Sequence, residues 1–171
     1  MDIVAHALWT NAAFYKKYKI DKKNRYLGAF FGVLPDIVSF APATIFLLFT
    51  NQRFSPALYN SSLWFFRWAE ESYNYTHSLV IFVIVMVIIM ALRKGKAYWP
   101  MFGWLLHILI DIPTHKDFYE TPFLFPLSDY HFSYGMAWAE PAFMFVNYGA
   151  LAVIYIFIFY FKKRQGAKAS P

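Results

Sequence analysis

Cysteine is absent from the 171-residue chain, which excludes disulfides and thiolate-bound zinc. Any metal centre must therefore use nitrogen and oxygen ligands. Charged side chains are also scarce, at 15% of the residues, whereas 59% are hydrophobic and 23% are aromatic. A soluble domain of this size could not bury so much apolar surface, so we expect residues 1–171 to form one domain integral to a membrane.

Apolar runs along the chain predict a small helical bundle. Residues 1–15 predict a half-length helix, and longer runs predict spanning helices at residues 26–50, 78–92, 97–112 and 141–161. The last run would form about 30 Å of helix, which matches the hydrocarbon core of a bilayer. We expect Pro35 to interrupt the first long run, with Asp36 as a candidate N-cap for its second half. The expected fold is an all-α integral membrane protein with about four spanning helices, a short N-terminal helix and an interfacial helix near residues 63–71.

Basic residues are clustered rather than spread along the chain. Six of the sixteen Lys and Arg lie in residues 16–25, three in residues 93–96 and four in residues 162–168. These clusters fall at alternate ends of the apolar runs, as the positive-inside rule requires. We therefore predict a cytoplasmic C-terminus, with residues 51–76 and 113–140 on the opposite side. The net charge of +6 then reflects topology, and we expect no nucleic-acid partner.

Five ionisable residues within or beside the apolar runs predict a metal site. His107 and Asp111 are one helical turn apart and project from one helix face. A helix rises about 1.5 Å per residue, so distance along the chain from a basic cluster estimates height above the plane of these clusters. His6, Asp36 and His107 come out at roughly 15–16 Å above this plane, and His77 and Asp111 at roughly 22–24 Å. Imidazole and carboxylate ligands suit one or two ions of zinc, manganese or iron. A hydrogen-bonded His–Asp network without metal is the alternative.

The segments 51–76 and 113–140 supply further candidates. Four polar residues of the outer segment are either solvated or in contact with substrate or metal: His115, Asp117, Asp129 and His131. Arg67 and Lys116 are among the few cations outside the basic clusters, and they could hold a phosphate. Either Asp36 or His115 could act as general base. We therefore count Arg67, Lys116, Asp129 and His131 as candidate substrate-binding residues.

Five short motifs give the chain a family resemblance: residues 1–8, 32–37, 76–79, 107–111 and 126–129. In this order they resemble the YdjM-like inner-membrane family, described as membrane-bound metal-dependent hydrolases. The resemblance implies a bacterial inner-membrane hydrolase with these metal ligands: His6, Asp36, His77, His107 and Asp111. The ligand order is also similar to part of that in zinc-dependent phospholipase C, which uses an additional His-x-x-x-Glu pair for a three-metal cluster. That pair is absent here, which favours one or two ions.

The expected activity is hydrolysis of a phosphoester or another ester of a lipid or lipid-linked substrate by metal-activated water. The alternative is a protein without enzymatic activity, either a metal-ion transporter or a bundle that a metal stabilises. Residues 81–92 and 101–106 contain no ionisable side chain, so a path from the site to the cytoplasm would lack polar steps. This asymmetry favours a pocket that opens on one side.

Overall fold

The computed structural model describes residues 1–15, 21–53, 55, 58, 63–116 and 120–168, the last eight of them as backbone only. Over this part of the chain it contains six α-helices, one short 3-10 helix and no strand. The elements are α1 (Ile3–Tyr15), α2 (Lys22–Thr50), α4 (Trp64–Thr76), α5 (Leu79–Leu92), η1 (Trp99–Met101), α6 (Phe102–Thr114) and α7 (Pro141–Lys168). The expected all-helical class is confirmed.

The number of candidate membrane spans is smaller than expected. In the described part of the chain, two helices are long and apolar enough to cross a bilayer, α2 and residues Pro141–Tyr160 of α7. A third is possible if α4 and α5, which are bent by 66° at their junction, form one broken span. The expectation of about four is therefore wrong, because α5 has 14 residues and α6 has 13, and a span needs about 20. The first part of the run 97–112 forms an extended segment and η1 instead of helix.

Helix α2 continues through Pro35, so the expected interruption and the N-cap role of Asp36 are both wrong. Asp21 is the N-cap, and its side chain accepts a hydrogen bond from the Asn24 backbone N–H. Proline is tolerated inside membrane helices where neighbouring groups satisfy the backbone carbonyls that it frees. Pro35 removes the donor that the Phe31 carbonyl would have in a regular helix. The adjacent carbonyl, that of Gly32, accepts a hydrogen bond from His107 Nδ1 at 2.8 Å. Asp36 consequently lies buried within the helix.

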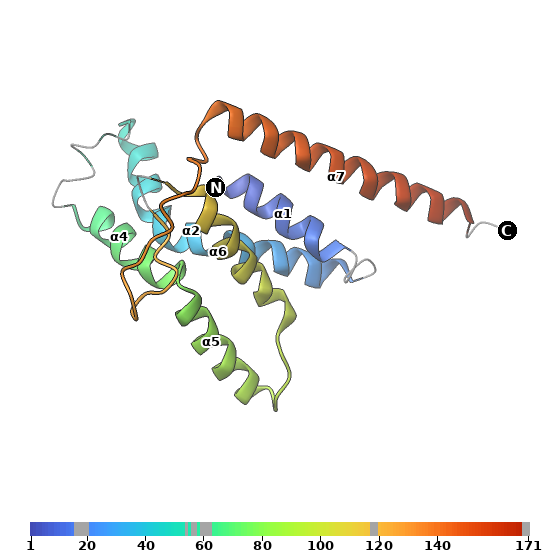
Figure 1. Cartoon of the computed structure of the whole chain (residues 1–171), viewed down its shortest axis with the longest axis horizontal. Coiled ribbons are helices and arrows are strands. Elements are labelled where there is room, and N and C mark those ends of the chain that lie inside the picture. The colour runs from blue at the N-terminus through green and yellow to red at the C-terminus, as the bar shows by residue number, and fades with distance from the viewer. Residues whose placement is uncertain (16–20, 54, 56–57, 59–62, 117–119, 169–171) are drawn as a thin grey trace.

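Close packing of α1, α2 and α6 forms the centre of the fold (Figure 1). Gly103 of α6 lies so close to α2 that an added Cβ would overlap the Gly28 carbonyl and lie 3.0 Å from the Gly32 nitrogen. An added Cβ at Gly32 would overlap the Thr10 side chain of α1. Small residues let the backbones of membrane helices approach in this way. This approach brings the Gly32 carbonyl within reach of a side chain on α6.

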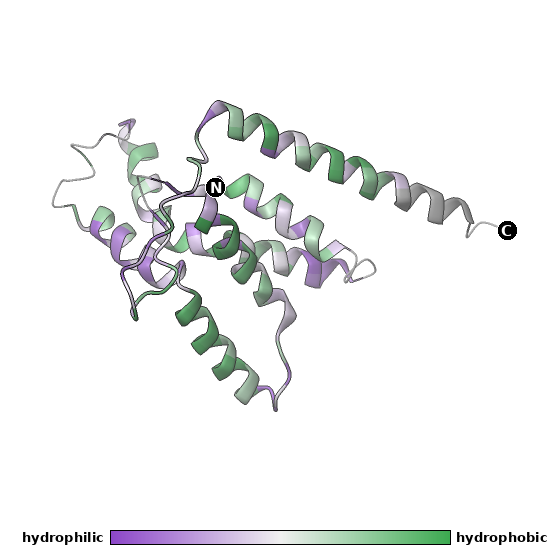
Figure 2. Cartoon of the chain, viewed as in Figure 1, coloured by the Kyte–Doolittle hydropathy of each residue, from purple (hydrophilic) through white to green (hydrophobic). Residues whose placement is uncertain are grey.

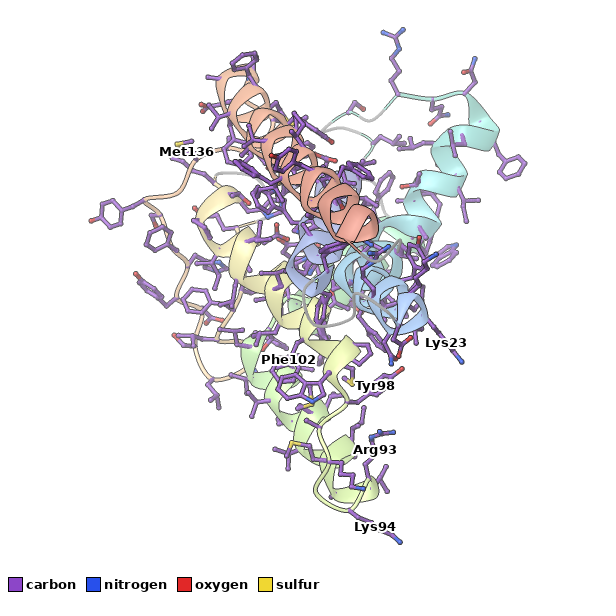
Figure 3. All side chains as sticks on the ribbon, turned by 90° about the vertical axis from the view of Figure 1, so that its right-hand side faces the viewer. Lys23, Arg93, Lys94, Tyr98, Phe102 and Met136 are labelled. Atoms are coloured by element: carbon purple, nitrogen blue, oxygen red, sulfur yellow. The ribbon has the colours of Figure 1, made fainter. Side chains whose placement is uncertain are left out.

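The remaining helices lie around this centre. Helix α7 runs alongside α1, where Met1, Ala5 and Leu151 form a small core (Figure 1). Figure 2 shows mainly hydrophobic residues along α5 and α7, and most of the apolar part of α7 is exposed, as expected for surfaces that face lipid. Figure 3 shows Arg93 and Lys94 at the tip that follows α5, far from Met136. The helix expected near residues 63–71 is present as α4, which extends to Thr76.

Candidate metal centre

Four buried side chains from three parts of the fold converge beside the α2–α6 contact. Asp36 comes from α2, His77 from the junction of α4 and α5, and His107 and Asp111 from α6. One potential ligand atom from each lies within 4.8 Å of the others. Asp111 Oδ2 is 3.1 Å from His107 Nε2 and 3.5 Å from His77 Nε2. Asp36 Oδ1 is 3.5 Å from His77 Nε2 and 3.7 Å from His107 Nε2.

Backbone carbonyls select the tautomer of both imidazoles. His107 Nδ1 is 2.8 Å from the Gly32 carbonyl, and His77 Nδ1 is 3.2 Å from the Tyr73 carbonyl. A carbonyl only accepts, so each Nδ1 carries a proton, and in the neutral ring each Nε2 presents a lone pair. The two Nε2 atoms nevertheless lie 3.0 Å apart. Two imidazole lone pairs and two carboxylates therefore face one another, which is an arrangement of acceptors that a cation would stabilise.

The spacing of these atoms fits a metal ion. Four ligands placed tetrahedrally at about 2.1 Å from zinc are about 3.4 Å apart. The N···O separations of 3.1 to 3.7 Å bracket this value, and the two Nε2 atoms are slightly closer, at 3.0 Å. Asp111 Oδ2 is buried and has no hydrogen-bond partner, although two imidazole nitrogens lie nearby. The ligand atoms thus converge on a common point instead of pairing with one another.

Aromatic contacts hold the two imidazoles in place. The Tyr73 ring stacks on His77 with centroids 3.7 Å apart, and the His6 ring stacks on His107 at 3.8 Å. Thr76 Oγ1 also lies 2.9 Å from His77 Nδ1. His77 is positioned where the chain bends between α4 and α5, because the Ser78 side chain caps the first turn of α5. Rings fixed in this way lose little freedom when they bind an ion.

The second oxygen of Asp111 has a different set of neighbours. Asp111 Oδ1 lies 2.9 Å from His6 Nε2, 3.3 Å from His115 Nδ1 and 2.6 Å from the Met1 nitrogen. Both ring nitrogens of His6 are buried and have no hydrogen bond. Asp111 therefore joins the four-residue cluster to His6 and His115. Of the five ligands expected from sequence, the structure places four in one cluster and His6 directly beside it.

The candidate substrate-binding residues are not joined to this cluster by any hydrogen bond or ion pair between described residues. Arg67, Lys116 and Asp129 are exposed, and His131 is half-buried. Asp117 lies outside the described residues. The sequence interpretation also missed the supporting groups, namely the Tyr73 ring, the Gly32 carbonyl and the Met1 nitrogen, because nothing in their local sequence indicates a role.

A family comparison agrees with the membrane character of the fold. Residues 1–169 match the family described as YdjM inner membrane protein, and the chain belongs to this family. Neither the curated proteins nor the solved structures contain a match to the chain. The family match relates the chain to inner membrane proteins.

Proposed function

We propose that this YdjM-family protein is a metal-dependent hydrolase that cleaves an ester or phosphoester of a lipid or lipid-linked substrate. The observation that carries the proposal is the group of four buried acceptors, two imidazole nitrogens and two carboxylates, that face one another. Two carboxylates in an apolar interior are costly unless positive charge compensates them. A divalent cation supplies that charge, and the mixed nitrogen and oxygen ligands favour zinc, with manganese or iron as alternatives.

The residues divide into two roles around Asp111. Asp36, His77, His107 and Asp111 would hold the main ion through the atoms that converge. When bound, such an ion lowers the pKa of a coordinated water and stabilises negative charge on the group under attack. Asp111 Oδ1 and His6 would be available for a second ion.

His115 is the better candidate for the proton acceptor. Asp36 belongs to the four converging ligands, so its carboxylate would be engaged by the ion. His115 is outside that group: its Nδ1 lies 3.3 Å from Asp111 Oδ1, and its Nε2 lies 3.3 Å from the Met1 nitrogen. At 8% exposure it is sheltered yet is less buried than His77 or His107, which are both fully buried. We therefore assign the general base to His115.

A structural metal is the second candidate function. The complete burial of His77, His107 and Asp111 favours it, because a catalytic ion needs an open position for water. Ion transport is less well supported, because residues 81–92 and 101–106 carry no ionisable side chain.

Metal analysis combined with a hydrolysis screen separates these candidates. Purified wild-type protein should contain zinc or another divalent ion and should hydrolyse a member of a phospholipid and polyprenyl-phosphate panel, with loss of activity in chelator. Asp111→Asn preserves side-chain size but removes the negative charge, so it should lose both the metal and the activity. Glu140→Gln, which alters an exposed carboxylate, is the matched control and should lose neither. Bound metal without hydrolysis of any substrate would favour the structural role.

A further inference from the structure

An apolar groove of about 660 Å³ lies between α1, α6 and α7. It follows α7 from Phe143 to Ile154, a length of about 16 Å along the helix. The groove exists because α7 packs on α1 through Leu151 and leaves space on its α6 side. Its volume is in the range of sites that hold small molecules.

One end of the groove adjoins the metal centre. Ile110 and Thr114 line the groove and flank Asp111 on α6. Met1 also lines it, and the Met1 nitrogen is 2.6 Å from Asp111 Oδ1. His115, the residue after Thr114, lies on the same side of Asp111. A molecule that occupied the groove would therefore extend toward the second oxygen of Asp111.

An unused hydrogen-bond donor lies in the wall of this groove. Asn147 lines the groove and is 7% exposed. Its Oδ1 accepts a hydrogen bond from Trp9 Nε1 at 2.8 Å. An indole N–H can only donate, so the atom that faces Trp9 is the amide oxygen of Asn147 and the other amide atom is the donor Nδ2. Asn147 Nδ2 is buried and has no partner, so a ligand acceptor that reached it would supply the hydrogen bond that it lacks.

We propose that the groove binds an acyl chain of a membrane lipid and that Asn147 Nδ2 donates to the ester carbonyl of that chain. The apolar walls match a hydrocarbon chain, and a single buried donor matches the one polar group that such a chain carries at its end. The exposed apolar surface of α7 places the groove where lipid is the surrounding solvent. Binding of the acyl chain does not depend on the proposed hydrolase function. The further step, in which the ester bond that is cleaved lies next to Asp111, rests on that function.

Photolabelling in vesicles tests the chain-binding site. The full chain is reconstituted in phosphatidylethanolamine and phosphatidylglycerol with a trace of phosphatidylglycerol that carries a diazirine on an ester-linked acyl chain. Label should concentrate on the groove residues Trp9 and Leu109, relative to Val87 on the exposed face of α5. Equal labelling of the groove and the α5 face would overturn the proposal, since it would indicate only general contact with lipid.

Two alanines on α7 provide a matched pair of variants. Ala150 lines the groove, whereas Ala152 is exposed outside it. Ala150→Phe should lower groove labelling by about fivefold or more, because the added ring fills space that the chain occupies. Ala152→Phe adds the same ring on the lipid-facing side and should leave the labelling unchanged. Undiminished groove labelling in Ala150→Phe would overturn the proposal.

A second measurement does not depend on whether Ala150→Phe folds. Wild-type protein should label more efficiently with the ester-linked probe than with its ether-linked analogue, by about two- to tenfold, because only the ester has a carbonyl for Asn147. Asn147→Leu should remove this preference, and an equal response of wild type to both probes would overturn the role of Asn147. Metal content is measured on the same samples. Groove labelling in metal-free wild-type protein would support chain binding and overturn the hydrolase proposal, whereas bound metal without groove labelling would overturn chain binding alone.

Discussion

The substitution Gly103→Ala tests how helix packing supports the metal centre. The new methyl group would overlap the Gly28 carbonyl and lie 3.0 Å from the Gly32 nitrogen, so α6 has to move away from α2. His107 is one turn further along α6, and the same movement would lengthen its hydrogen bond to the Gly32 carbonyl. Overpacking costs about 1–3 kcal/mol, and a lost hydrogen bond costs about 1 kcal/mol more. We therefore expect a destabilisation of about 2–4 kcal/mol.

The same movement should weaken metal binding, because the Gly32 carbonyl selects the His107 tautomer. Loss of such a supporting hydrogen bond typically lowers metal affinity by about 10- to 100-fold. Thermal unfolding in detergent measures the loss of stability in Gly103→Ala, and competition with a chromophoric chelator measures the loss of metal affinity.

Gly149→Ala is the control for this substitution. A Cβ at Gly149 has no atom within 4 Å, so stability and metal affinity should both be preserved. If Gly103→Ala were as stable as Gly149→Ala and bound metal equally well, the contact between α2 and α6 would not support the site as described.

Three further predictions address ligands, topology and transport. His107→Ala should lower bound metal at least about tenfold and abolish chelator-sensitive hydrolysis, and full metal occupancy in this variant would instead indicate a hydrogen-bonded His–Asp pair. Reporter fusions after Lys94 and after Thr121 should lie on opposite sides of the membrane, because the basic clusters alternate with the apolar runs; signals from one side would contradict this topology. Vesicles that contain the protein should show no zinc or manganese flux, whereas flux that disappears in Asp36→Ala would favour a transporter.

Several features of the fold could be predicted because they depend on local sequence. The scarcity of charge and the long apolar runs predicted a helical membrane protein, and the limits of α1 and α5 follow those runs closely. The spacing of His107 and Asp111 placed both on one helix face, since four residues make about one turn. Counting residues from the basic clusters placed His6, Asp36 and His107 at one depth, with His77 and Asp111 somewhat further along. The structure brings four of these residues into one cluster and places His6 beside Asp111.

Local sequence was less informative about where a helix begins or ends when contacts with neighbouring helices decide it. Pro35 predicted a break, but α2 continues through it and packs closely against α1 and α6. The run 97–112 looked long enough to be nearly a full span, yet its first residues lead into a 3-10 turn and leave α6 short. The short helices α5 and α6 explain why the sequence predicted about four spans and the described chain contains two or three.

Sequence by itself determined the helical class, the basic clusters and the residues that carry chemistry, because helix period and hydropathy are properties of contiguous residues. Tertiary structure alone decided which carbonyl faces His107, which oxygen of Asp111 faces His6, and that Asn147 lies in a groove next to Trp9. These contacts join residues that are between 75 and 138 positions apart in the chain, or that come from different helices. Which groups a side chain reaches depends on the distance between the packed helices. Gly28 and Gly32 of α2 and Gly103 of α6 allow a short distance between these helices, and they do so only in the folded protein, where the helices are in contact.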